Sequence, residues 1–146
     1  MNPYKRPESV LVVVYSRGGK VLLLRRADHP EFWQSVTGSM KWEESLPRRA
    51  AERELKEETG LEPEAGLQEL DLAFRYEILP QWRYRYAPEV TENLEHVFAL
   101  ELPVEVDVTL NPAEHTDYTW LNVKEALAKA TSWSNRDAIR QAVGSG

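Results

Sequence analysis

The chain contains no cysteine in its 146 residues, and this absence excludes several kinds of site. A protein without thiols has no disulfide bonds, no zinc–thiolate centre and no cysteine nucleophile. Long hydrophobic runs are also missing, because no apolar segment approaches the roughly 18 residues that a membrane-spanning helix needs. The first residues, MNPYKRPES, lack the apolar stretch of a signal peptide. We therefore expect a cytoplasmic protein with no membrane partner.

Positive charge is scarce in this sequence. The 18 Lys and Arg residues are outnumbered by 24 Asp and Glu residues, so the formal net charge is −6. Proteins that bind nucleic acid usually present a broad basic surface, and this composition therefore predicts no nucleic-acid partner. A protein of this charge that handles phosphates would have to gather cations locally, from a metal ion and a few Arg or Lys side chains.

Internal repeats, low-complexity tracts and long linkers are absent as well. Hydrophobic residues make up 42% of the chain, which contains five tryptophans. This composition is typical of a packed globular protein, and the length is sufficient for a core without disulfide or metal crosslinks. We expect residues 1–146 to form a single domain and the protein to be a monomer.

A helix with three carboxylates on one side is predicted from Pro47 to Thr59. Because each helical residue advances by about 100°, Glu54, Glu57 and Glu58 fall within about a third of the circumference. Proline is suited to the first turn of a helix, and Gly60 suits the left-handed residue that ends one. The helix therefore has recognisable ends and an acidic face.

Like charges at this spacing repel one another, so a cation is expected between them. Oxygen ligands suit a hard cation, and Mg²⁺ binds through one or two carboxylates together with substrate phosphates. The pattern predicts a magnesium site in which Mn²⁺ is able to replace Mg²⁺. An acidic helix face in a glutamate-rich protein is more often solvated surface, so the surrounding residues have to decide between the two interpretations.

Seven short strands are predicted around this helix from apolar runs bounded by Gly and Pro. They cover residues 9–15, 20–25, 35–38, 67–74, 81–86, 94–102 and 117–121. Two short helices are expected at the end of the chain, with N-caps at Asn122 and Ser134 and acids at Glu125 and Asp137. This order of elements predicts a mixed sheet flanked by helices.

The predicted strand 81–86 alternates aromatic and basic side chains. It would place Arg83 and Arg85 on one face and three aromatic rings on the other. Two interpretations stay open: one packed face and one solvated face, or a face that borders a pocket and binds phosphate or a flat ring. Glu114 and His115 are expected in the loop before the last strand, where Glu114 would add a carboxylate to the metal site.

Gly38, Glu44 and the run RELKEETGL from Arg53 to Leu61 resemble the signature of the Nudix hydrolases. The resemblance implies an α+β Nudix fold, an α/β/α sandwich around a mixed curved β-sheet. It also implies an ion pair between Arg53 and an acid that braces the loop before the helix. Eight residues separate Glu44 from Arg53, one more than in the family pattern, so three alternatives stay open: Glu44 pairs with Arg53, Glu43 takes this role, or the ion pair has been lost.

Further segments look like one branch of this family, the dihydroneopterin triphosphate pyrophosphohydrolases of bacterial folate biosynthesis. The matching stretches are YKRPESVLVV (4–13), PEFWQSVTGS (30–39), RYAPEVTEN (85–93), AEHTDYTWL (113–121) and SWSNRDAI (132–139). The resemblance implies a Mg²⁺-dependent hydrolase that cleaves the pyrophosphate bond of a small-molecule triphosphate. The implied substrate is 7,8-dihydroneopterin triphosphate, and the products are the monophosphate and pyrophosphate.

The same resemblance implies roles for individual residues. Metal binding would fall on Glu54, Glu57, Glu58, Glu114 and Gly38, and catalysis on Glu57 as general base with Arg53 and Glu44. Substrate binding would fall on Lys5, Arg25, Thr37, Tyr76, Glu77, Ile78, Leu79 and Ser132. In this scheme Lys5 and Arg25 are phosphate cations, and Tyr76 is an aromatic wall for a bicyclic ring.

Three other functions compete with this interpretation. The first is hydrolysis of ribo- or deoxynucleoside triphosphates, because a purine and a pterin present similar flat edges. The second is a non-catalytic Nudix-like ligand sensor, which the extra residue before Arg53 favours and the complete acidic run opposes. The third, an RNA-processing enzyme, is disfavoured by the negative net charge.

Overall fold

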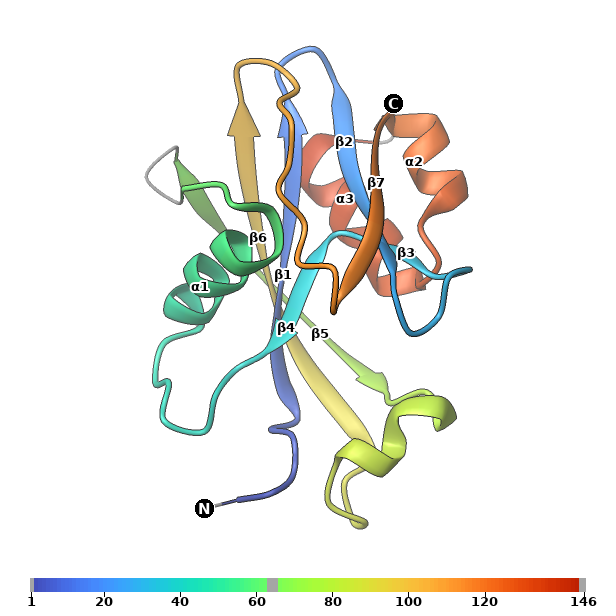
Figure 1. Cartoon of the computed structure of the whole chain (residues 1–146). Coiled ribbons are helices and arrows are strands. Elements are labelled where there is room, and N and C mark those ends of the chain that lie inside the picture. The colour runs from blue at the N-terminus through green and yellow to red at the C-terminus, as the bar shows by residue number, and fades with distance from the viewer. Residues whose placement is uncertain (1, 63–65, 145–146) are drawn as a thin grey trace.

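A computed structural model describes residues 2–62 and 66–144 and shows a β-sheet with helices on both faces (Figure 1). The strands are β1 (Glu8–Ser16), β2 (Lys20–Arg26), β3 (Trp33–Gln34), β4 (Val36–Ser39), β5 (Leu67–Glu77), β6 (Glu92–Leu102) and β7 (His115–Asn122). The helices are α1 (Pro47–Thr59), the 3₁₀ helix η2 (Pro80–Arg85), α2 (Val123–Lys129) and α3 (Trp133–Val143). Within the described ranges, none of the helices has the length and apolar character needed to cross a membrane.

The sheet is mixed, with the strand order β3-β2-β1-β6-β5, and β4 and β7 pair with β1 and β2 respectively. Strands β1 and β6 run parallel, whereas the other pairs are antiparallel. Strand β1 pairs with β2 at Tyr15 and with β4 from Ser9 to Val12. Strand β4 therefore enters the sheet where β1 and β2 diverge, and it leads the chain toward α1.

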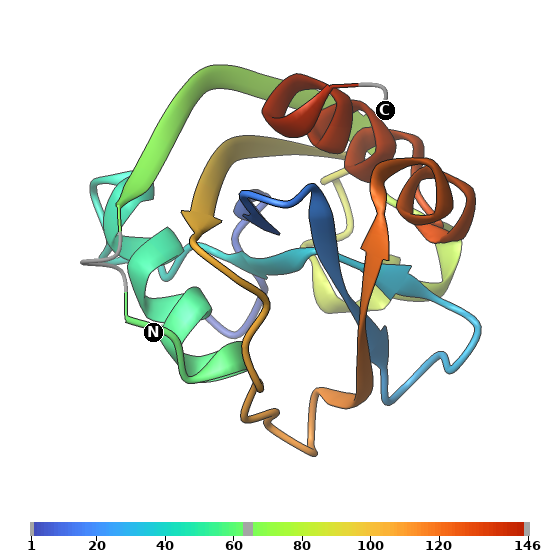
Figure 2. The same ribbon diagram turned by 90° about the horizontal axis from the view of Figure 1, so that it is seen from above.

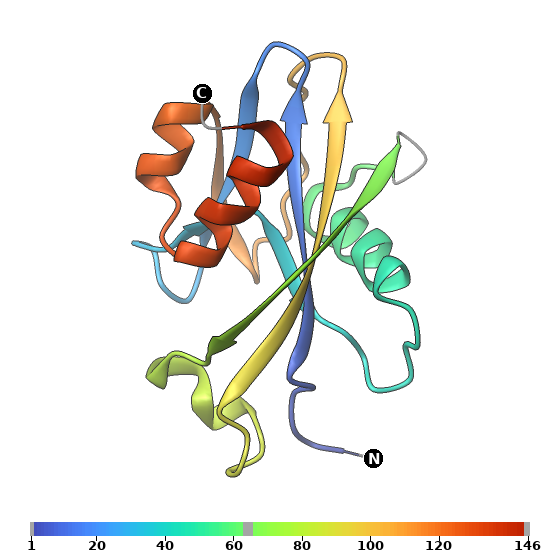
Figure 3. The ribbon, with the colours of Figure 1, turned by 180° about the vertical axis from the view of Figure 1, so that it is seen from behind.

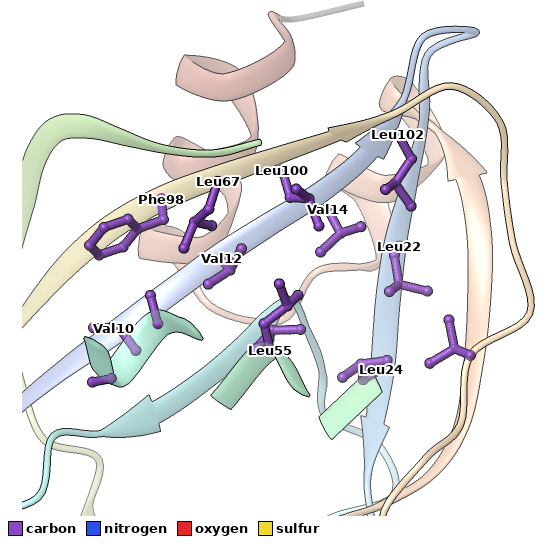
Figure 4. Packing of buried hydrophobic residues seen from close by; sticks show 14 of the residues in the cluster. Val10, Val12, Val14, Leu22, Leu24, Leu55, Leu67, Phe98, Leu100 and Leu102 are labelled. Atoms are coloured by element: carbon purple, nitrogen blue, oxygen red, sulfur yellow. The ribbon is translucent and has the colours of Figure 1, made fainter. Parts of the chain in front are cut away.

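Alternate residues of β1 pack into two separate hydrophobic cores. Val10, Val12 and Val14 pack on the face covered by α1, where Leu55 is fully buried (Figure 4). Leu11 and Val13 belong to the opposite core, which α2 and α3 cover (Figure 2). A strand buried on both faces explains the continuous apolar run predicted for this segment. The α/β/α arrangement of the predicted fold is confirmed.

The predicted helix Pro47–Thr59 is confirmed as α1, with both of its predicted ends. Pro47 stands at the first helical position. Gly60 follows the last turn with a φ of 75°, and its N–H donates to the carbonyl of Lys56 at 2.9 Å. This left-handed conformation is easily adopted by glycine and costs other residues about 1 kcal/mol. Local sequence therefore determines the length of α1.

The strand predicted at 81–86 is wrong, because this segment forms the 3₁₀ helix η2. Pro80 begins the helix, and the N–H of Trp82 donates to the carbonyl of Leu79 at 3.0 Å. Proline presets a helical φ and has no N–H for a ladder, and it outweighs the alternating pattern after it. Viewed from behind, η2 lies beyond the ends of β5 and β6 (Figure 3).

One of the two predicted helix caps is also wrong. Asn122 caps α2 as expected, since its side chain accepts from the N–H of Glu125 at 2.8 Å. Helix α3 is capped by Ser132, whose Oγ accepts from the N–H of Asn135 at 3.2 Å, and not by Ser134. Ser134 is buried inside the first turn, because the helix begins two residues earlier than predicted so that Asn135 can reach β3 and β4.

Candidate active site

A cavity of about 730 Å³ lies between α1, η2 and the beginning of α3. Its lining includes Thr37 and Gly38 of β4, Glu54 and Glu58 of α1, Trp82 and Arg85 of η2, Asn93 and Glu95 of β6, and Ser132 before α3. Cavities of roughly 300–1,000 Å³ are usual for small-molecule sites. This one is therefore large enough for a substrate with both a ring and a phosphate chain.

The acidic end of the cavity consists of Glu54, Glu58 and Glu114. The Glu58 side chain is only 4% exposed, and the Glu54 side chain is 12% exposed. Burial, together with the neighbouring Glu54 carboxylate, raises the pKa of Glu58 well above its usual range. The backbone N–H of Thr37 donates to Glu58 Oε1 at 3.4 Å. Arg53 donates to one oxygen of Glu54, but the raised pKa of Glu58 shows that the two neighbouring carboxylates still form an environment that a further cation would stabilise.

Gly38 leaves room for this pair. A methyl group on Gly38 would overlap the Glu54 carboxylate, with Oε1 only 2.6 Å away. Any side chain at this position would push Glu54 out of the cavity, so the glycine is required by close approach. The oxygen donors of Glu54 and Glu58, with Glu114 in the same cavity wall, fit the ligand chemistry of Mg²⁺.

The four carboxylates predicted as metal ligands are not equally placed. Glu57 is 52% exposed, lies 3.4 Å from Arg53 and is not part of the cavity wall. In the part of the chain that the structure describes, no three acidic or histidine side chains come close enough together to form a complete metal-binding group. The structure thus brings Glu54 and Glu58 together, places Glu114 in the same cavity, and leaves Glu57 outside it.

Arg53 pairs with Glu44, the first of the two acids that the sequence left open. Its Nε and Nη2 donate to the two oxygens of Glu44 at 3.0 and 2.9 Å, and Nη1 donates to Glu54 Oε1 at 2.6 Å. The hydrogen bonds from Arg53 lower the pKa of Glu44. The loop absorbs the additional residue without loss of this pair, and Arg53 holds Glu54 beside Gly38 from outside the cavity.

Cationic side chains gather around the cavity although the protein is acidic overall. Lys5, Arg26, Arg85 and Arg136 all belong to its lining. Burial and the nearby guanidinium groups of Arg85 and Arg26 lower the pKa of Lys5 to about 8. The backbone N–H of Lys5 also donates to the carbonyl of Arg85 at 2.8 Å. These residues supply the local positive charge that a phosphate ligand needs.

Arg25, predicted as a phosphate contact, is not part of the cavity lining, whereas its neighbour Arg26 is. Arg25 donates instead to the carbonyl of Pro30 at 2.9 Å. The guanidinium of Arg26 lies 4.5 Å from the ring centroid of Trp82 and makes two hydrogen bonds to Asp28. Neighbouring residues of a strand point to opposite faces of the sheet, so only one of the two arginines faces the cavity.

The other predicted substrate residues are divided in the same way. Lys5, Thr37, Tyr76, Ile78, Leu79 and Ser132 line the cavity, and Glu77 does not. Aromatic side chains of η2 and α3 also line the cavity, including Trp82 and Trp133. The ring of Trp133 packs edge-on against Tyr76 at 6.5 Å. This part of the cavity is suited to a flat heterocycle.

Three buried polar residues beside the site were not predicted from the sequence. His115, expected in an exposed loop, begins β7 and is 2% exposed, with Nδ1 3.9 Å from Glu58 Oε1. Burial and nearby Arg26 lower the pKa of His115 to about 4, so its imidazole is neutral near pH 7. Asn93 and Glu95 line the cavity from β6. Their spacing of two within a strongly apolar strand was the available signal, because such residues share one face.

Two of the segments that suggested a particular branch of the family meet in space. The N–H of Ser35 donates to Asn135 Oδ1 at 2.7 Å, and Asn135 Nδ2 donates to Ser35 Oγ at 2.9 Å. The N–H of Trp33 donates to Thr131 Oγ1 at 2.9 Å. Asn135 is fully buried, so these bonds fix the beginning of α3 against β3 and β4 and shape the cavity wall.

Comparison with known proteins agrees with this geometry. The model of the NUDIX domain family matches residues 5–142. Dihydroneopterin triphosphate diphosphatase of Escherichia coli K12 is 46% identical over 144 residues, covering 96% of this chain and 94% of that protein. The protein of the same name from Haemophilus influenzae is 40% identical over 145 residues, with coverages of 97% and 90%.

A solved structure extends the agreement to three dimensions. That of the E. coli dihydroneopterin triphosphate pyrophosphohydrolase has a TM-score of 0.91 and 44% identity, and it covers 97% of this chain and 98% of its own. The predicted fold and the predicted hydrolase class are confirmed by these similarities. The chain belongs to the Nudix domain family.

Proposed function

We propose that this protein is a Mg²⁺-dependent pyrophosphohydrolase that converts 7,8-dihydroneopterin triphosphate to the monophosphate and pyrophosphate in folate biosynthesis. One observation carries the proposal: a single cavity is lined both by the carboxylates Glu54 and Glu58 and by the aromatic residues Tyr76 and Trp82. The relatives named for this substrate support it, because they match nearly the whole chain.

The residues that would hold Mg²⁺ are Glu54, Glu58 and Glu114. When bound, the ion would offset the negative charge of the phosphate oxygens and lower the pKa of a water molecule. The chain's own residues bind and orient the substrate: Lys5 and Arg85 lie where they can pair with phosphate oxygens. Water adds to a phosphorus atom, and the P–O bond that bridges the α- and β-phosphates breaks. The two products are therefore the monophosphate and pyrophosphate.

Glu57 is the general base predicted from the sequence. Its carboxylate is half exposed and lies 3.4 Å from Arg53 Nη1. A base has to reach the attacking water directly or through a second water molecule. We therefore propose that Glu57 acts by holding Arg53 and through it Glu54, and that a carboxylate of the cavity receives the proton.

The experiment that tests the proposal is a comparison of kcat/KM with Mg²⁺ for dihydroneopterin triphosphate and a panel of ribo- and deoxynucleoside triphosphates, followed as pyrophosphate release. We expect a clear preference for the pterin, and we expect Glu58→Gln protein purified in parallel to be inactive. A preference for nucleotides would replace the substrate but keep the chemistry. No turnover of any triphosphate would favour the ligand sensor.

Three further expectations belong to this proposal. The family match over residues 5–142 supports a single domain. The absence of cysteine is consistent with the reducing cytoplasm. We also propose that the active form is a monomer. Sedimentation of the active protein at assay concentration would test this last point.

A further inference from the structure

Two buried residues of β6, Asn93 and Glu95, form part of the cavity wall but have no task in the phosphate chemistry. They are 1% and 3% exposed. Because they are two residues apart in a strand, both side chains lie on the same face of the sheet. The hydroxyl of Thr37 reaches Glu95 Oε2 at 3.2 Å, while the backbone of Thr37 reaches Glu58. Thr37 thus connects this polar pair to the acidic end.

Hydroxyl groups determine how the two side chains are oriented. Ser9 Oγ and Tyr76 Oη donate to Glu95 Oε2 at 3.2 and 3.3 Å. Each hydroxyl has one proton, so each accepts in turn from Asn93 Nδ2, at 2.8 and 3.1 Å. Burial raises the pKa of Tyr76, which keeps its hydroxyl protonated. The NH₂ group of Asn93 is therefore directed to the hydroxyls, and its oxygen is directed away from them.

One oxygen of each side chain remains without a partner. In the described chain, Asn93 Oδ1 and Glu95 Oε1 are buried and neither accepts a hydrogen bond. A buried acceptor without a donor destabilises the fold, and folded proteins rarely keep such groups without a functional reason. Burial also raises the pKa of Glu95, which reflects the cost of its charge in this place. A ligand that brings N–H groups would remove this cost.

We propose that Asn93 and Glu95 recognise the 2-amino-4-oxopyrimidine edge of the substrate ring, each free oxygen accepting one N–H. This edge presents two donors side by side, the exocyclic amino group and the adjacent ring N–H. Pterins and guanine share it. Adenine and cytosine instead place their amino group next to a ring nitrogen that accepts, and uracil has one N–H between two carbonyls. The inference rests on the proposed function in taking the ring to lie in this cavity.

Asn93 and Glu95 therefore determine which heterocycles bind in the cavity. The groups that act on the phosphates have no part in this selection. A site built to accept hydrogen bonds rejects a ligand that lacks the donors far more strongly than an apolar pocket rejects a change in size. Guanosine and inosine are matched probes, since they differ only in the 2-amino group. Their binding to the metal-free protein can be measured by calorimetry, without turnover and without a phosphate chain.

We expect the unaltered protein to bind guanosine and neopterin at least 10-fold more tightly than inosine or adenosine. In Glu95→Gln the amide oxygen has to serve the hydroxyl donors, which turns its NH₂ toward the ring donors. The ratio of guanosine to inosine affinity should then fall to near 1. Glu92→Gln is the control, because Glu92 is an exposed acid of the same strand outside the cavity lining, and it should keep the ratio of the unaltered protein.

Equal binding of guanosine and inosine by the unaltered protein would overturn this inference, and so would an unchanged ratio in Glu95→Gln. The comparison on the unaltered protein needs no variant, so the test holds even where Glu95→Gln does not fold. Failure of the proposed function would look different. The unaltered protein would still prefer guanosine and Glu95→Gln would still lose this preference, but no pyrophosphate would be released from dihydroneopterin triphosphate.

Discussion

Gly38 and the carboxylate of Glu54 are in such close contact that β4 and α1 leave no space for a side chain between them. Gly38→Ala should therefore displace Glu54 and lower kcat by about 100-fold or more, as expected for a lost electrostatic contribution of a few kcal/mol. The melting temperature should fall only slightly, because the displaced atoms are the end of a flexible side chain.

The control for this substitution is Gly18→Ala. Gly18 lies in the β1–β2 turn, and a methyl group there would meet Ser16 Oγ at an ordinary 3.9 Å. Activity and melting temperature of this variant should stay close to those of the unaltered protein. Full activity of Gly38→Ala in a pyrophosphate-release assay would show that the position of Glu54 is not critical.

The pair of Arg53 and Glu44 should make stability depend on pH. Both side chains are mostly buried, at 19% and 14% exposure, so Glu44→Gln should lower the free energy of unfolding by about 2–3 kcal/mol near pH 7. Arg53 lowers the pKa of Glu44. The contribution of the pair is therefore complete above the unfolded pKa of about 4.3 and is lost as the pH falls through the folded pKa.

Urea unfolding of the unaltered protein and of Glu44→Gln from pH 3 to pH 7 measures this effect. The difference between them should shrink as the pH falls below about 4.3, where the unfolded chain takes up the proton, and should be lost once the folded Glu44 is protonated as well. Glu43→Gln serves as the control, since Glu43 is the acid that Arg53 does not use in the described contacts. A difference independent of pH would contradict the ion pair.

Glu58 should behave in the opposite way in the absence of metal. Its raised pKa means that wild-type stability falls as the pH rises from the unfolded value of about 4.3 toward the folded pKa. Glu58→Gln removes this cost, so its melting temperature in EDTA at pH 7–8 should be a few degrees higher. Millimolar Mg²⁺ should raise the melting temperature of the unaltered protein and leave that of Glu58→Gln nearly unchanged.

Glu57→Gln is the matched control for Glu58→Gln. It removes the carboxylate of the preceding residue, which does not line the cavity. It should keep the Mg²⁺-dependent rise in melting temperature. Loss of that rise in Glu57→Gln would return Glu57 to the set of metal ligands, and a rise that persists in Glu58→Gln would remove Glu58 from it. Both results are obtained by differential scanning fluorimetry.

Arg25 and Arg26 provide a second matched pair. Arg26→Gln should raise KM for the triphosphate about 10-fold, since a charge-assisted hydrogen bond contributes roughly 1.5–3 kcal/mol. Arg25→Gln should change KM less than about 2-fold, because Arg25 binds the carbonyl of Pro30 outside the cavity lining. The reverse order in steady-state kinetics would support the role predicted from sequence for Arg25.

Lys5 should make substrate binding sensitive to alkaline pH. Its pKa is lowered to about 8, so the ammonium group is present below that pH and lost above it. KM for the triphosphate should therefore rise as the pH increases from about 7.5 to 9.5. Lys5→Arg keeps its charge over this range and should flatten the rise. Identical KM profiles for the two proteins would exclude Lys5 as a phosphate ligand.

Helix α1 was predictable because everything that defines it is local. The spacing of Glu54, Glu57 and Glu58 follows from the helical period, and Pro47 and Gly60 are adjacent to the ends they set. The continuous apolar run of residues 9–15 likewise predicted a buried strand, which is β1. By contrast, η2 was predicted as a strand because its alternating residues follow a proline whose effect on the backbone outweighs the pattern.

Sequence by itself determined the acidic helix and its two ends, since these depend on residues close together in the chain, and the resemblance of its motifs to the Nudix signature implied the family and the sandwich fold. Only the tertiary structure decided that Glu57 lies outside the cavity, that Arg26 and not Arg25 lines it, and that Asn93 and Glu95 each keep a buried oxygen without a partner among the described residues. These properties depend on strand register and on contacts between distant segments. Such contacts form only when the sheet is assembled, because one residue of register shift exchanges the two faces of a strand.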